Sequence, residues 1–462
     1  MIGGGLAGLA ASVALADAGY RVRLFEKRPH LGGRATSYDL PNGEHVDNCQ
    51  HVTMGCCTNL EDFYRRVGSA RQIRYYDRIF FLDRDGRRGI IEPSPLPAPL
   101  HLGPSFLLFP SLDIRDKLAI ARAMWTITRH GGSPPSAARR VSMLDWLREN
   151  HQTENAIRRF WDTVLVSALD ERLEKMDAAY GVLVFWKGFL LNRRGFEIGI
   201  PTVPLAELYG GCQQAIESRG GEVRLRAGVR GLRIEGEQLK AVQLDDGSEI
   251  AADACVLAVT QDAVSALLPG PLRAAKPFGP LANLGVSPIT GVHFWFDRAV
   301  MNEPFLTLLD RTTQWVFNKT YLSGGDASAG QYLQLVISAS YDLVQRSRQE
   351  IIDLCRSELA EAVPETRAAR LLKATVVKEV AATFSPAPGS DAFRPSAATP
   401  IANLFLAGDW TATGWPSTME SAVRSGYLAA EAVTKAAGSS QSFLRPDLPA
   451  EGMSRLFAKN SV

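Results

Sequence analysis

Glycines near the start of the chain are spaced so that a backbone can pass close to phosphate groups. The run Gly-Gly-Gly-Leu-Ala-Gly satisfies the pattern Gly-x-Gly-x-x-Gly. In this pattern Gly3 permits a tight turn from strand to helix, Gly5 leaves room for a pyrophosphate, and Gly8 lets the helix pack closely on the sheet. Leu6 and Ala7 begin the helix, whose free N–H groups and positive dipole end attract phosphate. These residues are therefore candidate contacts of a dinucleotide, although the pattern alone is common.

The elements expected around these glycines fit a strand-helix-strand unit. Residues 6–18 are rich in alanine and predict a helix, and residues 21–25 alternate like a strand that finishes on Glu26. A carboxylate at this place accepts hydrogen bonds from ribose hydroxyls and disfavours a 2′-phosphate. Lys27, which follows it, is a further candidate contact. Only residues 1–2 precede the turn, so either the first strand is unusually short or the natural chain begins further upstream.

Two further segments combine glycines with a charged residue. Gly32 and Gly33 let the backbone pass close to a ligand, and Arg34 can neutralise the charge of a diphosphate. Far along the chain, a short apolar strand ends in Gly408 and Asp409. A turn beside a surface arginine would explain the first of these segments in isolation. Its combination with the N-terminal unit favours a cofactor site instead.

Both segments resemble signatures of a known group. Residues 31–37 and 403–409 are similar to the FAD-binding signatures of the flavoproteins that include amine oxidases, protoporphyrinogen oxidase and carotenoid desaturases. The resemblance implies that Asp409 holds a ribityl hydroxyl, and that a helix beginning near Met419 points its start at the pyrimidine edge of the flavin. It also implies that the backbone of Val229 meets the adenine, with a core valine at a strand end as the alternative.

The same resemblance implies an α/β fold, in which a Rossmann-like FAD-binding domain carries an inserted substrate domain of α+β type. The FAD is expected to be non-covalent, because residues 407–420 contain no cysteine. The expected division of the chain is residues 1–75, 205–275 and 395–436 for the FAD-binding domain, 76–204 and 276–394 for the substrate domain, and 437–462 for a tail.

The expected substrate domain is rich in apolar and aromatic residues. Residues 90–110 combine prolines, which disfavour a regular helix, with leucines and phenylalanines, which disfavour a solvated loop. This loop is expected either to rest on a bilayer as an apolar mouth or to pack against its own domain. Residues 114–128 predict an amphipathic helix, which fits either case. Several aromatic residues could line a long apolar cavity or belong to the core: Phe160, Trp161, Phe185, Trp186, Phe189, Phe294, Trp295, Phe296 and Trp315.

Longer stretches resemble one subgroup of these flavoproteins. The stretches that are similar to hydroxysqualene dehydroxylase, also called squalene-associated FAD-dependent desaturase, are residues 46–52, 55–60, 160–165, 408–411 and 414–426. Cys49 and Ser421 depart from the subgroup's pattern, which usually has glycine at both places. The resemblance implies that reduced FAD delivers a hydride to hydroxysqualene, which loses its hydroxyl as water and becomes squalene. This reaction belongs to squalene and hopanoid synthesis.

No motif identifies the proton donor for such a reaction. His51 and Glu420 are candidate catalytic residues because of their position near the FAD segments. The external electron donor stays open. Three other functions fit the same signatures: a carotenoid or phytoene desaturase, an amine or protoporphyrinogen oxidase, and a lipid- or flavin-binding protein without turnover.

Composition narrows the class of protein and its location. With 46% hydrophobic and 22% charged residues over 462 positions, the chain has the balance of a globular protein of more than one domain. The net charge of +2 gives no sign of a nucleic-acid partner. The six cysteines form no CxxC pair and are expected to be reduced and free of metal. Because the sequence shows neither a secretory signal nor a run of about 18 apolar residues, we expect a cytoplasmic protein, and the resemblance to hydroxysqualene dehydroxylase implies a bacterial one. It would be peripherally bound to the cytoplasmic membrane, where it meets its isoprenoid lipid.

Overall fold

Short parallel strands form the part of the fold that holds the first residues. The computed structural model describes residues 1–39, 45–133 and 140–458. In it β1 (Arg23–Phe25) pairs with β9 (Glu222–Arg224), and β13 (Cys255–Leu257) pairs with β19 (Leu404–Leu406), both in parallel. Ile2 bridges Phe25 on one side and Leu257 on the other, so the short first strand joins the two pairs.

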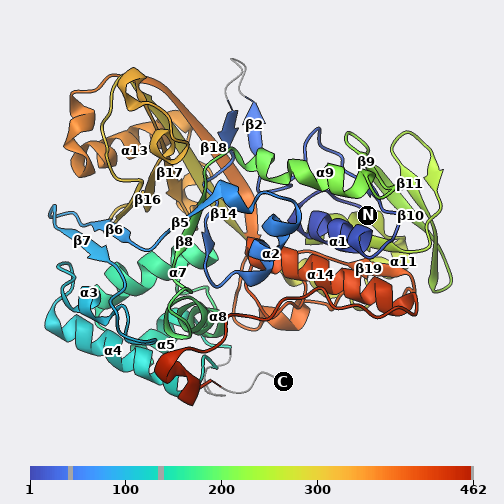
Figure 1. The fold of residues 1–462 in the computed structure, drawn as a ribbon, viewed down its shortest axis with the longest axis horizontal. Helices are drawn as coiled ribbons and strands as arrows, with labels where there is room; N and C mark the ends of the chain where they lie inside the picture. Colours follow the sequence, from blue (N-terminus) through green and yellow to red (C-terminus); the bar gives the residue numbers. More distant parts are fainter. Residues whose placement is uncertain (40–44, 134–139, 459–462) are drawn as a thin grey trace.

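Three helices pack around these strands. α1 (Leu6–Asp17) contacts both α14 (Met419–Ala436) and α9 (Gly210–Glu217), and they lie together on the right of Figure 1. A Cβ added to Gly8 would lie 2.0 Å from the Gly3 carbonyl oxygen, and one added to Gly426 would lie 2.3 Å from the Ala7 oxygen. Glycine therefore permits the close approach of α1 to the turn before it and to α14.

A small antiparallel sheet and a short 3-10 helix adjoin these elements. The sheet consists of β10 (Val229–Glu235), β11 (Gln238–Leu244) and β12 (Glu249–Ile250). Residues 205–217 form two elements in the structure, a 3-10 helix, η5 (Leu205–Tyr209), followed by α9.

A seven-stranded sheet gathers residues from two distant parts of the chain. All neighbouring pairs are antiparallel except β15 and β6, which run in parallel. α13 (Arg348–Ala362), which begins with a capping box of Ser347 and Glu350, packs on this sheet. The strand order is β18 (Leu371–Phe384), β14 (Val286–Phe296), β17 (Gln331–Ile337), β16 (Trp315–Asn318), β15 (Phe305–Leu308), β6 (Ile79–Leu82) and β7 (Arg88–Ile91).

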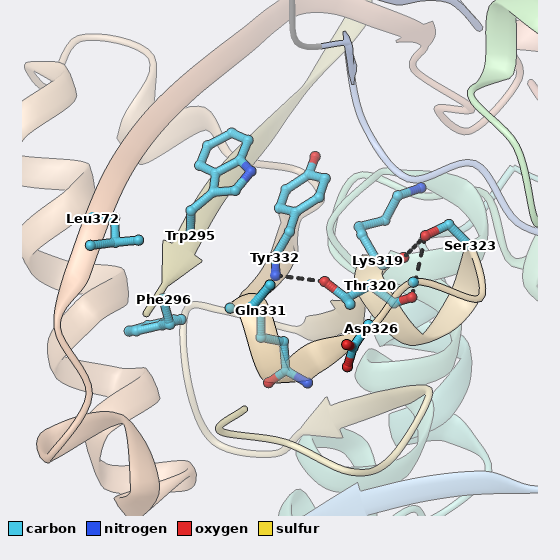
Figure 2. Close-up of a pocket in the computed structure, with 12 residues that line it drawn as sticks. Trp295, Phe296, Lys319, Thr320, Ser323, Asp326, Gln331, Tyr332 and Leu372 are labelled. Atoms are coloured by element: carbon cyan, nitrogen blue, oxygen red, sulfur yellow. Dashed lines mark hydrogen bonds between the residues drawn. The ribbon is translucent and has the colours of Figure 1, made fainter. Parts of the chain in front are cut away.

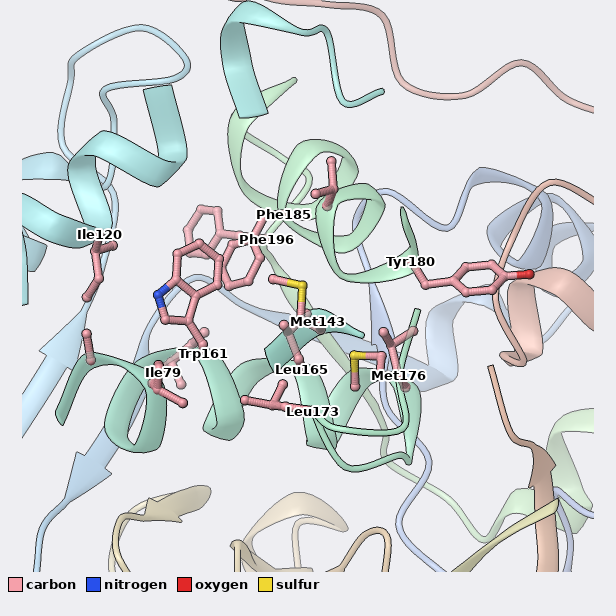
Figure 3. Close-up of a cluster of buried hydrophobic side chains, with 14 of the residues drawn as sticks. Ile79, Ile120, Met143, Trp161, Leu165, Leu173, Met176, Tyr180, Phe185 and Phe196 are labelled. Atoms are coloured by element: carbon pink, nitrogen blue, oxygen red, sulfur yellow. The ribbon is translucent and has the colours of Figure 1, made fainter. Parts of the chain in front are cut away.

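A group of helices lies below this sheet, at the lower left of Figure 1. Its core is the cluster of Figure 3, in which Trp161, Phe185 and Met143 pack with apolar residues of neighbouring elements. The helices are α3 (Gly103–Leu107), α4 (Ile114–Arg129), α5 (Met143–Glu149), α6 (Glu154–Ala156), α7 (Asp162–Leu169) and α8 (Ala178–Phe185), with π-helical segments η3 (Ile157–Trp161) and η4 (Trp186–Leu190).

Hydrogen bonds cross the boundaries that the sequence suggested between domains. β8 (Ile198–Pro201) lies between β4 (Thr53–Met54) and β5 (Ile73–Tyr76) in a three-stranded sheet. β2 (Ser37–Asp39) and β3 (His45–Asp47) form a separate pair. The sheet of β4, β8 and β5 thus ties residues on the two sides of position 75 firmly together.

The segment 90–110 differs from the loop that its prolines predicted. β7 covers its first residues, and α3 forms one helical turn with Pro104 in its first positions. Proline is tolerated there, because the N–H groups of the first helical turn have no intrahelical acceptor. The expectation that no helix forms in this segment is therefore wrong for residues 103–107.

Candidate functional site

A cavity of about 1050 Å³ joins the glycine-rich segments to the group of helices. One end is lined by Gly3, Gly5, Leu6 and Ala7 at the start of α1. The other end is lined by residues of α4, α7, α8 and η4. A cavity of this volume, with its two ends on different parts of the fold, suits a large cofactor with a long ligand beside it.

The glycine segments form a close-packed floor at the first end. Gly32 N–H donates to the Gly4 carbonyl at 2.9 Å. Gly33 has a φ of +63°, and a Cβ added to it would lie 2.9 Å from the Gly5 Cα. α1 begins without a side-chain cap or an acidic residue in its first turn, so its first N–H groups are available to an anion. These features fit the pyrophosphate of FAD.

Glu26 lies where the sequence placed the ribose contact. Its carboxylate accepts hydrogen bonds from the N–H groups of Gly4 at 2.6 Å and Arg28 at 2.8 Å. The side chain is buried and lines the cavity. Lys27 and Val229 line the same cavity, and Lys27 is exposed. Gly8 does not line the cavity and lies close to the Gly3 carbonyl, so its contact with the cofactor stays a prediction.

Arg34 and Asp409 bind each other across 375 positions of sequence. Arg34 Nη2 donates to the Asp409 carboxylate, and Nη1 donates to the Ala382 carbonyl at 2.8 Å. Ser417 Oγ donates to the other oxygen of Asp409. The sequence suggested that Arg34 neutralises a diphosphate, whereas in this structure its charge is balanced by Asp409. Both residues and Gly408 line the cavity.

The start of α14 reaches the cavity through Met419 and Glu420. Thr418 caps the helix by accepting a hydrogen bond from the Ser421 N–H at 3.1 Å. The Ser421 hydroxyl is buried, lies 2.7 Å from Thr413 Oγ1 and donates to the Asp409 carbonyl at 3.1 Å. The hydroxyl that departs from the resembled pattern therefore turns into the fold and strengthens the loop around Asp409.

Glu420 anchors one helix to another. Its carboxylate accepts hydrogen bonds from the N–H of Leu60 at 2.8 Å and from the side chain and N–H of Asn59 at 2.9 and 3.2 Å. These N–H groups belong to the start of α2 (Thr58–Arg66), and Arg424 lies 3.5 Å away. Burial raises the pKa of Glu420. With its oxygens occupied, the carboxyl caps α2, and its catalytic role remains a sequence-based prediction.

His51 lines the cavity beside Cys49. Its Nδ1 lies 3.0 Å from the Cys49 carbonyl oxygen, which fixes Nδ1 as the protonated nitrogen. Burial lowers the pKa of His51, so the ring is neutral at neutral pH and offers the lone pair of Nε2. Burial raises the pKa of the Cys49 thiol.

The cavity wall contains polar residues that the sequence did not identify as site residues. The adjacent cysteines Cys56 and Cys57 line it, and so does Asp170 at the end of α7. A sequence motif is a local pattern, whereas these residues belong to no motif and are brought to the cavity wall only by the fold.

The expected aromatic residues divide between the cavity and the core. Phe160, Phe185, Phe189 and Trp315 line the cavity. The others on that list lie elsewhere, and Trp161 and Phe294 are fully buried in the core. The lining aromatics come from η3, α8, η4 and β16, so they surround the apolar part of the cavity from several sides.

A second, open hollow of about 330 Å³ lies on the seven-stranded sheet, away from the predicted site residues. Figure 2 shows Trp295 beside Tyr332, and their rings stack at 4.6 Å. Lys319 turns from it toward the interior, where it donates to Asp47 at 2.9 Å and Gln50 at 2.8 Å. Among the described residues, no helix has the length and apolar composition needed to cross a bilayer. In the same ranges no three potential ligand side chains gather around a metal position.

Comparison with known proteins places this geometry among flavoproteins. Residues 6–434 match the family described as flavin containing amine oxidoreductase. The chain is 28% identical to 15-cis-phytoene desaturase of Solanum lycopersicum over 457 residues, covering 94% of this chain and 77% of that protein. It is also 28% identical to zeta-carotene desaturase of Synechocystis sp. over 470 residues, covering 94% and 96%.

Solved structures share the fold at lower identity. An oxidoreductase from Methanosarcina mazei has a TM-score of 0.72 at 16% identity, covering 92% of this chain and 97% of that chain. Cyclohexylamine oxidase from Brevibacterium oxydans has a TM-score of 0.68 at 16% identity, covering 95% and 98%. The mixed α/β flavoprotein fold expected from the sequence is thereby confirmed.

Proposed function

Because the chain belongs to the flavin-containing amine oxidoreductases, we propose that it is an oxidoreductase of a long isoprenoid lipid. FAD is the cofactor of this family, and when bound it takes up or gives a hydride at its flavin ring. The relatives named above act on phytoene and zeta-carotene, which are isoprenoids. Desaturation of such a hydrocarbon is therefore the reaction that we place first.

The observation that carries the proposal is the continuity of the cavity. Its glycine-lined end fits FAD, and its apolar end is lined by Phe160, Phe185, Phe189 and Trp315. An extended hydrocarbon in this part would lie beside the cofactor with water excluded. Aromatic ring faces would also stabilise positive charge that develops on an unsaturated chain.

Reductive dehydroxylation of hydroxysqualene to squalene is the second candidate. It rests on the resemblance of residues 408–426 and on one feature of the cavity. Burial raises the pKa of the wall residue Asp170 to about 8, so its carboxyl keeps a proton at neutral pH. A departing hydroxyl needs such a proton to leave as water.

Product analysis separates the two candidates. FAD-loaded protein is incubated with phytoene or zeta-carotene and a quinone acceptor, and in parallel with hydroxysqualene and a reductant without oxygen. New conjugated double bonds, seen by absorbance, would support desaturation, and squalene would support dehydroxylation. The absence of turnover with all three substrates, in protein that retains FAD, would refute the proposed function.

We also propose that the apolar end of the cavity opens onto a membrane. Leu100 and Trp125 line the cavity, and yet their side chains are 48% and 56% exposed. The 3-10 helix η11 (Gly452–Leu456) joins this mouth, because Met453 N–H donates to the Ala98 carbonyl. The surrounding surface has further exposed apolar side chains: Leu96, Leu107, Leu108, Ile114, Leu118, Met453 and Leu456.

Charges next to this apolar surface suit an anionic bilayer. Arg115, Arg122 and Arg129 are exposed on α4, close to its exposed apolar residues Ile114, Leu118 and Trp125. An amphipathic helix with arginine beside its apolar face lies in the headgroup region of a membrane. On this proposal the protein is peripheral to the bacterial cytoplasmic membrane and takes its lipid directly from it.

Vesicle binding tests the membrane proposal. Leu118→Glu with Trp125→Glu should greatly reduce co-sedimentation with vesicles that contain anionic lipid. Leu372→Glu is the matched control, because Leu372 is exposed to a similar extent (54%) on β18, away from the mouth. Equal binding by the double variant and the control would show that this surface does not meet the membrane.

A further inference from the structure

Asp170 occupies an unusual place in the wall of the cavity. It follows the last residue of α7 and has left-handed backbone angles, φ 51° and ψ 38°. Thr163 and Ser167 of the same helix line the cavity beside it. A residue other than glycine in this conformation costs about 1–2 kcal/mol, and such strain gathers at functional sites.

A second left-handed residue holds the Asp170 carboxylate. Asp170 Oδ1 accepts a hydrogen bond from the Ala339 N–H at 2.7 Å, and Ala339 has a φ of +49°. Asp170 Oδ2 accepts one from Thr383 Oγ1 at 2.9 Å. Two strained backbones and a strand therefore fix one carboxyl group at the surface of the cavity.

Thr383 connects this carboxyl group to the cofactor end. It lies on β18 between Ala382, whose carbonyl binds Arg34, and Phe384, whose N–H donates to Ser417 at 3.3 Å. Arg34 and Ser417 are the two residues that hold Asp409. Asp170 is thus linked to the segments that carry the FAD signatures through a single residue, Thr383, whose two neighbours in β18 bind Arg34 and Ser417.

The surroundings of Asp170 disfavour a negative charge. The residue is 4% exposed, and no arginine or lysine of the described ranges forms an ion pair with it. The titratable groups around it are Glu171 on the same chain turn, Cys49, and Tyr341. Burial is the main cause of the raised pKa, and the charge of Glu171 adds to it, while the hydrogen bonds from the Ala339 N–H and the Thr383 hydroxyl oppose it.

We propose that Asp170 is the acid–base residue of the cavity, which exchanges a proton with the lipid. This inference rests on the proposed function. In desaturation, FAD would serve as the oxidant when bound, by accepting a hydride from one carbon of the lipid. The C–H bond of the neighbouring carbon breaks, its electron pair forms the double bond, and its proton passes to the Asp170 carboxylate. In dehydroxylation, reduced FAD is the reductant. The Asp170 carboxyl then protonates the leaving hydroxyl, and a hydride replaces it on carbon.

The two directions require opposite protonation states. Desaturation uses the carboxylate, so its rate should rise as the pH increases through about 8, the pKa raised by burial. Dehydroxylation uses the carboxyl group, so its rate should fall over the same interval. The pH profile of the wild-type protein would therefore also identify the direction of the reaction.

Asp170→Asn is the decisive variant. Asparagine tolerates left-handed angles and keeps an oxygen for the Ala339 N–H, so the fold should persist. Turnover should fall by about 100-fold or more, and the pH dependence near 8 should disappear. The control is Asp177→Asn, since Asp177 is also buried, accepts two N–H groups from Ala179 and Gly389, and does not line the cavity. Its turnover and pH profile should match the wild type.

Infrared spectroscopy gives a readout that needs no turnover. In FAD-loaded wild-type protein, a carboxylic acid C=O band should titrate away near pH 8, and Asp170→Asn should lack it. Wild-type turnover and pH dependence in Asp170→Asn would overturn the inference and leave the proposed function intact. Absence of the titrating band in the wild type would also overturn it. If the wild type turned over no isoprenoid, the proposed function would fail, and the infrared titration would still decide whether Asp170 holds a proton.

Discussion

Glu26 is held so that its carboxylate faces the cavity with a fixed orientation. The N–H groups of Gly4 and Arg28 bind its two oxygens, and each oxygen keeps a further lone pair for a ribose hydroxyl. We expect Glu26→Gln to weaken FAD binding by about 10- to 100-fold, because the amide loses the charge and opposes one N–H group. Titration of apoprotein with FAD, followed by flavin fluorescence, measures the change.

Glu222→Gln provides the comparison for that variant. Glu222 lies on β9, the strand paired with β1, but its partly exposed side chain faces Arg224 rather than the cavity. Its FAD affinity should equal that of the wild type. A loss of the same size in both variants would assign the effect to the sheet, not to the ribose contact.

His101 should make the stability of the protein depend on pH. It is fully buried, neither ring nitrogen has a partner among the described residues, and burial lowers its pKa from 6.5 to about 4. Arg193 lowers the pKa further, and Glu451 opposes it. Between these pH values the unfolded chain binds the proton and the folded chain does not. Stability is therefore complete above pH 6.5 and falls as the pH decreases toward 4, by up to about 3 kcal/mol.

Denaturant unfolding between pH 7 and pH 4 measures this loss. His101→Leu removes the titrating group without leaving a large gap, so the free energy of unfolding should decrease less over the interval than in the wild type. A parallel decrease in both proteins would contradict the role of His101.

At the scale of elements, the close contact of α1 with the turn before it limits which side chains can replace the hydrogen of Gly8. Gly8→Ala would place a Cβ 2.0 Å from the Gly3 oxygen, so the turn must shift. We expect a loss of about 1–3 kcal/mol in stability and weaker FAD binding. Gly210→Ala, at the start of α9, has open space and a helical φ of −56°, so it should be neutral or slightly stabilising. Thermal unfolding with and without FAD compares them.

The elements that sequence predicts well are those whose cause is local. Alanine-rich residues with a glycine turn before them form α1, and α14 begins near Met419 as expected. The segment 90–110 was harder, because proline excludes a helix only beyond its first turn and α3 begins there. The division of residues 205–217 into η5 and α9 had no sequence signal that we used.

The candidate site shows the same limit. Gly32, Arg34 and Asp409 were recognised one by one, but the pairing of Arg34 with Asp409 depends on two segments that meet only in the fold. Asp170 carries no motif, and its properties come from Ala339, in the bend after β17, and from Thr383 on β18, both far from it in sequence. Asp170 is recognisable as a candidate acid–base residue only from its burial and its contacts in the fold.

At the scale of the whole molecule, bound FAD should stabilise the folded state, and its removal should lower the stability. Residues of widely separated segments line the cofactor end, so binding stabilises their assembly over the unfolded chain. At a free concentration about 100 times the Kd, FAD should add about 2.7 kcal/mol to stability. Removal of FAD should therefore lower the unfolding temperature, as calorimetry can measure.

The mode of attachment is open to a separate check. Cys56 and Cys57 line the cavity, although residues 407–420 lack cysteine. We expect FAD to be non-covalent, so acid precipitation should leave the yellow colour in the supernatant. Colour retained in the pellet would contradict this expectation and direct attention to those two thiols.

The place of Ile2 between Phe25 and Leu257 has a consequence for biosynthesis. The first residues leave the ribosome early, but one of their sheet partners is made much later, and β19 follows about 400 residues after them. At typical rates of translation this is a wait of roughly 20 to 80 seconds. During that time the apolar face of α1 has no complete surface to cover it, so the nascent chain is exposed to aggregation. Because one cofactor site is built from segments made at different times, we expect chaperones to lower the aggregation of the nascent chain.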